Sequence, residues 1–320
     1  MRTFGAVAWQ NFVCTMREPA LLVAVLAALC LLALAPLGTA FGFHEQQGLV
    51  RDIGLSTVFL GGILAAMIAG TRRESDALRA LIMARPIGPG AYFLGGFAGV
   101  ALAAAVAGGA IACMGAVLLR DSAGIAFDRE GWAYAAAAVL LALGAGAWRN
   151  IRAGRSFPAG ALGALCVLSA AAACIALMRA PGGGLRAALS DADVLLLQAE
   201  ALTLCAGLAV LCAVWAGSML LGRPGGMLAG GAVIVLGQTK EYFGAALDAI
   251  PLPLGPLVPN FQLVWGGDFF YGDIAVLPGS FVAQGAAALC AWSAAAVLLG
   301  LACFPCRAGR GIRAPELGVR

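Results

Sequence analysis

The chain has 320 residues, of which 62% are hydrophobic and 11% charged, and its mean hydropathy is +0.94. Soluble domains are about 45–50% apolar and about 25% charged, and a soluble fold of this length cannot hide so much apolar surface from water. These values exclude a soluble enzyme, a secreted disulfide scaffold and a disordered chain. They predict an all-α bundle of membrane helices in a lipid bilayer, because one membrane helix needs about 20 apolar residues.

The first predicted element is an interfacial amphipathic helix over residues 1–19. Its apolar residues recur every four positions, a spacing that places them on one helix face: Phe4, Ala8, Phe12 and Met16. A helix with one apolar stripe favours a position on the surface of the bilayer rather than across it. The apolar run that follows is too long for a cleaved signal peptide, so we expect it to be the first span.

Eight apolar runs of spanning length follow, and we expect about eight transmembrane helices within a permease domain over 20–310. The runs cover about 20–40, 53–71, 91–119, 132–148, 159–178, 195–221, 227–246 and 279–304. If the N-terminus is cytoplasmic, most of the 20 Lys and Arg residues fall in cytoplasmic segments, as the positive-inside rule requires. We therefore expect a multi-pass protein of the cell (inner) membrane, with both termini and the tail 311–320 in the cytoplasm.

A charged segment at 72–90 separates the second and third runs. Its acidic residues precede its Arg residues, an order that complements the helix dipole, and Pro86 ends the helix. Four of its side chains are spaced to share one face: Leu78, Leu81, Ile82 and Arg85. A short amphipathic helix of this kind is suited to docking in a groove on a partner protein. The alternative is a plain charged loop between two spans.

A second segment, at 248–278, is rich in Pro and aromatic residues. Such a sequence is too interrupted by Pro to form a spanning helix, so we expect short helices and turns on the outer face, held by aromatic anchors. Two roles are open for it. The segment either gates a pathway or covers the helix bundle.

The scarce residue types exclude several kinds of site. The single Lys, Lys240, is followed by Glu241 rather than Ser or Thr, so the chain has no Walker A loop for nucleotide phosphates. One His, His44, cannot form the paired ligands of a zinc hydrolase. We interpret the Cys residues as small hydrophobic side chains, the close pair Cys303 and Cys306 included. We expect no catalytic residue, no metal site and no nucleic-acid partner.

Glu200 is the clearest carboxylate inside an apolar run. An acid within the membrane is a functional candidate by default, and an ion-coupled carrier needs such a group. Glu200 is also only one or two helix turns from the predicted interface, where it can reach water. Both interpretations are open on the sequence alone.

Two motifs resemble those of the permease subunits of type-2 ABC exporters, in particular the permeases grouped with multicopper-enzyme-maturation systems. The first is Ile82-Met83-Ala84-Arg85-Pro86-Ile87 followed by Tyr92-Phe93-Leu94-Gly95-Gly96-Phe97, and the second is Val258-Pro259-Asn260-Phe261-Gln262. The opening helix and the Arg residues after the last span are also similar to the family pattern. The resemblance implies a six-span core, in which residues 132–178 are an inserted pair.

The resemblance also implies a division of labour. Segment 72–90 becomes a coupling helix that docks on a separate ABC ATPase subunit, which holds ATP and Mg, while this chain holds no cofactor. A second permease copy or a related permease completes the pathway. The implied docking residues are Glu74, Asp76, Leu78, Arg79, Leu81, Ile82, Arg85 and Pro86. The implied pathway or outer-gate residues are Glu200, Pro259, Asn260, Phe261 and Gln262. The alternatives are an ion-coupled secondary carrier using Glu200 and a polytopic membrane enzyme.

Overall fold

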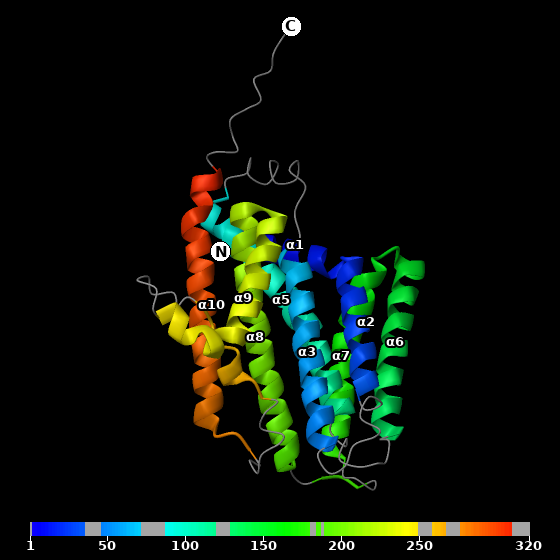
Figure 1. Ribbon diagram of the computed structural model, residues 1–320. Helices are drawn as coiled ribbons and strands as arrows, with labels where there is room; N and C mark the ends of the chain where they lie inside the picture. The colour runs from blue at the N-terminus through cyan, green and yellow to red at the C-terminus, as the bar shows by residue number, and fades with distance from the viewer. Residues whose placement is uncertain are drawn as a thin grey trace.

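The computed structural model describes residues 2–35, 46–71, 87–119, 129–179, 184–186, 189–248, 258–266 and 276–308. Every regular element in these ranges is a helix, which confirms the all-α prediction (Figure 1). The helices are α1 (Arg2–Met16), α2 (Pro19–Leu34), α3 (Gln46–Gly70), α5 (Pro89–Leu118), α6 (Arg129–Ala153), α7 (Phe157–Met178), α8 (Asp191–Leu221), α9 (Arg223–Asp248), the short 3-10 helix η3 (Gln262–Val264) and α10 (Gly279–Ala308).

Six of the described helices are long and apolar enough to cross a membrane, namely α3, α5, α6, α7, α8 and α10. Helices α1 and α2 meet at a bend of 59°, and counted together they raise the number to seven. The chain is therefore built as a multi-pass membrane protein. The predicted seventh run, which corresponds to α9, does not meet the same criterion in the described residues.

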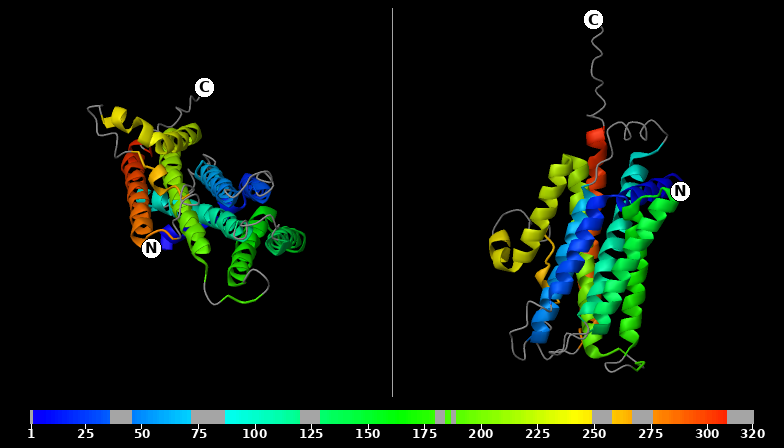
Figure 2. Two further views of the ribbon diagram at one scale, coloured as in Figure 1. Left: turned by 60° about the horizontal axis from the view of Figure 1, so that its bottom comes forward. Right: turned by 90° about the vertical axis from the view of Figure 1, so that its right-hand side faces the viewer.

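Helix α1 lies across one end of the bundle, which we call the α1 end, while the long helices run side by side (Figures 1 and 2). It crosses α5 where two glycines allow close approach. A Cβ atom at Gly95 would lie 3.1 Å from Val7 Cβ, and one at Gly99 would lie 2.8 Å from the main-chain nitrogen of Phe12. Glycines four residues apart thus form a flat surface on which a second helix packs closely, as is common in membranes.

Helix α8 is the central element of the bundle, because α3, α9 and α10 all pack along it. Near the α1 end, Trp215 of α8 meets Phe93 of α5 with ring centroids 6.1 Å apart. Phe93 in turn meets Phe304 of α10 at 5.5 Å. Three long helices are therefore joined at this end by buried aromatic side chains.

Helices α6 and α7 form a pair that packs on the rest of the bundle mainly through α7 and α5. Their mutual approach depends on small residues, since a Cβ atom at Gly146 would lie 2.9 Å from Ala161 Cβ. The outer face of α6 is apolar and exposed, with Leu140 at 69% and Leu141 at 61%. This face is suited to contact with lipid.

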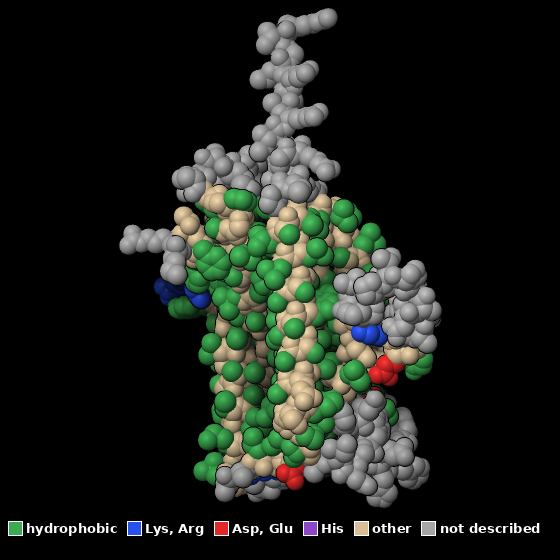
Figure 3. All heavy atoms as spheres, turned by 90° about the vertical axis from the view of Figure 1, so that its left-hand side faces the viewer, with side chains coloured by type: hydrophobic (Ala, Val, Ile, Leu, Met, Phe, Trp, Pro, Cys, Tyr) green, Lys and Arg blue, Asp and Glu red, His purple; other side chains and the backbone are tan. Residues whose placement is uncertain are grey.

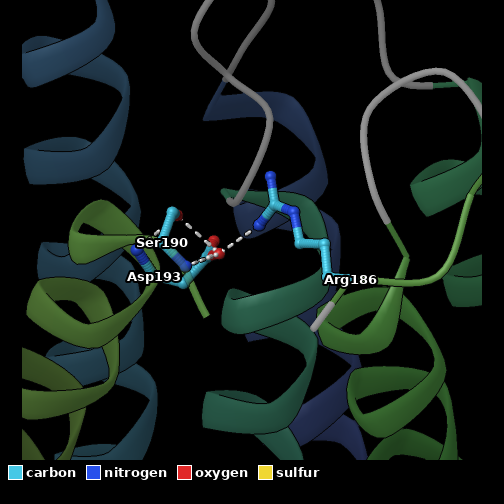
Figure 4. Close-up of polar contacts among 3 residues, drawn as sticks. All are labelled: Arg186, Ser190 and Asp193. Carbon is cyan, nitrogen blue, oxygen red and sulfur yellow. Dashed lines mark hydrogen bonds and ion pairs between the residues drawn. The ribbon is translucent and has the colours of Figure 1, made fainter. Parts of the chain in front are cut away.

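The start of α8, at the end of the bundle opposite α1, is fixed by a reciprocal cap (Figure 4). The Ser190 hydroxyl accepts from the Asp193 main-chain N–H at 3.3 Å, and Asp193 Oδ2 accepts from the Ser190 N–H at 3.2 Å. This capping box satisfies main-chain donors that a helix start leaves unpaired. Arg186 donates to the same Asp193 oxygen at 2.5 Å, which pairs a carboxylate that is only 2% exposed.

Candidate functional site

The most irregular part of the described bundle is the crossing that begins with α9. Helix α9 leaves the α1 end through a tight turn at Gly222, whose φ of +82° favours glycine. It then packs closely on α8 through small residues, since a Cβ atom at Gly225 would lie 3.2 Å from the Gly217 carbonyl oxygen. Its last turns swing sideways, away from α8 (Figures 1 and 2).

Helix α9 is therefore a partial crossing, although the sequence predicts a full span at 227–246. Its 26 residues are about 39 Å long at 1.5 Å per residue, so length alone does not prevent a complete crossing. The crossing is incomplete because the last turns of α9 change direction. The chain re-enters the bundle at residues 258–266, and we call α9 together with this segment the broken crossing.

Phe261 fixes the segment to α9. Its main-chain N–H donates to the Gly237 carbonyl oxygen at 3.1 Å, and its ring, only 1% exposed, lies over Gly237. A Cβ atom at position 237 would be 2.6 Å from the ring. The ring also meets Phe59 of α3 edge to face, with centroids 6.0 Å apart. Phe59 lies roughly 16 Å along α3 from Gly48, so Phe261 is inside the bundle.

This depth differs from the expected position on the outer face. Two aromatic side chains predicted to anchor the segment in an interface, Phe261 and Trp265, instead pack into the helix bundle, where Trp265 also meets Phe59 at 5.5 Å. The rest of segment 248–278 lies largely outside the described residues. Backbone outside α-helices is tolerated at such depth where protein surrounds it or where it lines a cavity. Phe261 is buried in the bundle, and five other residues of the segment line a groove.

Side chains satisfy the polar groups of this non-helical segment. Asn260 Oδ1 accepts from the main-chain N–H groups of Gln262 and Leu263, at 3.1 and 3.3 Å. Lys240 Nζ donates to the Val258 carbonyl oxygen at 2.7 Å. Lys240 thus lies where α9 and the segment meet.

A groove of about 520 Å³ lies beside the broken crossing. We call it the α9–α10 groove, because Lys240 of α9 and several residues of α10 line it together with Val258, Pro259, Asn260, Leu263 and Val264. Its lining is mainly apolar, and it includes two of the predicted gate residues, Pro259 and Asn260. The volume is within the range of ligand sites, about 300–1,000 Å³.

Glu200 belongs to a different part of the bundle. It is 3% exposed, and its carboxyl group lies over Gly115 of α5, with Glu200 Cδ 3.5 Å from the position of a Cβ atom there. No described group hydrogen-bonds its Oε1 atom. The expectation that Glu200 can reach water is therefore wrong for this conformation. The preceding residue, Ala199, instead packs against Gly266 of the broken crossing.

The predicted docking residues Glu74, Asp76, Leu78, Arg79, Leu81, Ile82, Arg85 and Pro86 lie outside the described residues. The residues on either side of this loop are described. Thr71 follows the end of α3, and Ile87 precedes α5, both at the α1 end (Figure 1). The predicted docking loop therefore leaves the bundle and returns to it at the α1 end.

Sequence reasoning did not identify two residues that hold non-local contacts here, Gly237 within the broken crossing and Gln198 on α8. A glycine in a chain with 45 of them carries little signal, and Gln198 acts on Leu277, far away in the sequence. In the part of the chain that the structure describes, no three His, Cys, Asp or Glu residues cluster as metal ligands. No family model, curated protein or solved structure matches this chain.

Proposed function

We propose that this chain is the membrane-spanning permease subunit of an ATP-driven exporter, with ATP hydrolysis carried out by a separate subunit. The observation that carries the proposal is the convergence of elements at the α1 end. Helix α1, the two flanks of the predicted docking loop and the end of α10 all lie there (Figure 1). A partner bound to the loop would act on all of them together.

The contacts at this end provide a mechanical route from the loop into the bundle. Displacement of the loop would act on Ile87 and then on α5, which begins at Pro89. From α5, the close contact of Gly95 and Gly99 with α1 would transmit the displacement to α1. Phe93 would transmit it to α8 and α10. Packed helices move as rigid bodies between discrete arrangements, which is the response that a power stroke requires.

The place of Lys240 supports a separate nucleotide site. A Walker A lysine must lie in a glycine-rich loop with Ser or Thr next to it, where it contacts nucleotide phosphates. Lys240 is instead on α9, and its Nζ atom is 2.7 Å from the Val258 carbonyl oxygen. It is the only Lys in the chain, so ATP binding of this type would be on another protein.

The broken crossing supports the proposal that this helix movement transports a substrate. Transporters often bind their substrates at discontinuous helices, where non-helical backbone lines a cavity inside the membrane. Here the interruption lies between α9 and residues 258–266, and a groove accompanies it. Closure or opening of that groove would require only that α9 and α10 tilt relative to α8.

Orientation follows from the charges on the two sides of the bundle. Several Arg residues lie near the α1 end, and in the described ranges they are Arg2, Arg17, Arg149, Arg152, Arg155, Arg223 and Arg307. By the positive-inside rule, we propose that the α1 end faces the cytoplasm. The ATPase would then be on the side where ATP is available.

Docking can be tested with paired aspartates in the predicted coupling helix. Leu81→Asp with Ile82→Asp introduces two charges on the predicted docking face. Ala80→Asp with Met83→Asp introduces the same charges on the opposite face. We expect only the first pair to abolish copurification of a Walker A-containing ATPase from native membranes and ATP-dependent export. Retention of both by the first pair contradicts the proposal.

The second candidate, an ion-coupled carrier, is favoured by the burial of Glu200, which is 3% exposed. Glu200→Gln distinguishes the two, because the amide has the same shape but carries no exchangeable carboxyl proton. An exporter driven by ATP keeps its ATP-dependent transport in this variant. A carrier that uses this carboxyl group for coupling loses its dependence on an ion gradient.

A further inference from the structure

The α9–α10 groove lies on the α10 side of the bundle, where hydrophobic side chains cover much of the visible face (Figure 3). Helix α10 supplies most of the described lining, residues 258–264 supply most of the rest, and α9 supplies Lys240. Val264 and Leu289 in this lining are both under 10% exposed. At its mouth, Leu263 is 59% exposed, and Gln284 and Ala288 are also exposed. In a membrane, a molecule can therefore enter this groove directly from the bilayer.

The groove lining includes three polar side chains. Lys240 of α9 is the only charged residue among the described residues that line it, and the other two are Asn260, on the segment after α9, and Gln284, on α10. The Asn260 Oδ1 atom is occupied by two main-chain N–H groups, so the amide nitrogen is the end that can face a ligand. These side chains therefore present hydrogen-bond donors, which complement a phosphate or carboxylate.

Apart from Gln284, the α10 wall of the groove is apolar. Phe281, Leu289 and Trp292 recur along one side of α10 over about three turns, roughly 16 Å of helix. A wall of this length and chemistry accommodates a hydrocarbon chain. Lys240 lies on the same groove rather than at the membrane surface, since it is joined to a segment that packs inside the bundle. Charged groups at such depth commonly mark a substrate pathway.

From these observations we propose that the α9–α10 groove binds an anionic lipid that enters from the bilayer. Lys240, Asn260 and Gln284 contact the head group, and Phe281, Leu289 and Trp292 contact one chain. The cavity of about 520 Å³ holds a head group and part of a chain, and the remainder stays in the bilayer. The identification of this lipid as cargo rests on the proposed exporter function, whereas its binding does not.

Binding can be measured on the full chain alone, reconstituted in nanodiscs without any ATPase. The probes are phosphatidylglycerol and phosphatidylcholine with identical diazirine-bearing chains, and labelled α10 peptides are quantified by mass spectrometry. We expect phosphatidylglycerol to label α10 about tenfold more, since a hydrogen bond to a charged group is worth about that factor in affinity. Lys240→Gln removes this preference, and Lys240→Arg keeps it.

A steric pair of variants tests the groove itself. Ala288→Trp fills the groove and should abolish the labelling, whereas Ala294→Trp places the same side chain on an exposed position of α10 outside the groove. Size-exclusion elution identical to that of the unmodified chain shows that each variant is folded. This comparison does not depend on the charge of Lys240.

Three results overturn the proposal. The first is equal labelling by the two lipids, and the second is labelling that is unchanged by both Lys240→Gln and Ala288→Trp. The third is crosslinking of two chains through the groove without lipid labelling, which would make a second copy the occupant. The exporter proposal can fail independently, because retained ATPase docking in the Leu81→Asp, Ile82→Asp variant would contradict it and would leave this lipid assay, which contains no ATPase, unaffected.

Discussion

Gln198 binds both main-chain groups of Leu277, a residue far away in the sequence. The Gln198 Nε2 atom donates to the Leu277 carbonyl oxygen at 3.1 Å, and the Leu277 N–H donates to Gln198 Oε1 at 3.0 Å. The side-chain amide therefore acts as a peptide group would in a neighbouring strand. It joins α8 to the chain just before α10, where residues 276–278 are not helical.

Replacing Gln198 by Leu should destabilise the bundle. Leu277 is buried, so its N–H and carbonyl groups lose their partner without gaining water, at a cost of about 1–3 kcal/mol for an unpaired buried group. Thermal unfolding in detergent should show a lower midpoint. The control is Gln10→Leu at an exposed position of α1, which should leave the midpoint nearly unchanged. Equal midpoints for the two variants contradict a structural role for Gln198.

The fit between Glu200 and Gly115 gives a second prediction. A Cβ atom at position 115 would collide with Glu200 Oε1 and would lie 3.1 Å from Val58 Cγ2. Gly115→Ala should therefore destabilise the chain by about 1–3 kcal/mol, as overpacking does. Gly109→Ala on the same helix meets no atom within 4 Å and should be neutral or stabilising.

A double-mutant cycle tests whether Glu200 is the residue responsible. In the Glu200→Ala background the colliding carboxyl group is absent, so Gly115→Ala should be tolerated better than in the unmodified chain. Residues in contact are expected to show such coupling, whereas distant residues give additive effects. Additive unfolding free energies for the two substitutions would mean that they do not meet in the folded protein.

The positions of most helices could be predicted from the sequence because local signals suffice for them. Long apolar runs correspond to α5, α7 and α8, and proline in the first turn marks the starts of α2, α5 and α7. These features depend on neighbours within a few residues. They need no knowledge of which helices pack together.

The broken crossing could not be predicted in the same way. The hydrogen bond between Phe261 and Gly237 joins residues on different elements, and hydropathy averaged along the chain has no access to such a contact. The same reason explains why the burial of Glu200 could not be predicted. Its distance from the helix start suggested exposure to water, but its burial depends on Gly115 of α5, which leaves space for the carboxyl group.

The crossing of α1 over α5 gives a third prediction. Gly99→Ala places a methyl group 2.8 Å from the Phe12 main-chain nitrogen, and a helix backbone cannot yield locally as a flexible side chain can. We expect α1 to separate from α5, with faster amide hydrogen exchange around Asn11. In the proposed exporter, ATP hydrolysis should continue while export falls. The control is Gly62→Ala of α3, which meets no atom within 4 Å, and equal exchange in both variants contradicts the prediction.

The contact between Gly237 and Phe261 gives the last prediction. A methyl group at position 237 would be 2.6 Å from the Phe261 ring, so Gly237→Ala should push residues 258–266 away from α9 and change the α9–α10 groove. Gly231→Ala introduces the same methyl group on the same helix, where no atom lies within 4 Å. We expect only Gly237→Ala to reduce export and the labelling of α10 by anionic lipid, with ATPase copurification retained in both. If Gly237→Ala transports and binds lipid as Gly231→Ala does, the broken crossing is a structural feature and the pathway lies elsewhere in the bundle.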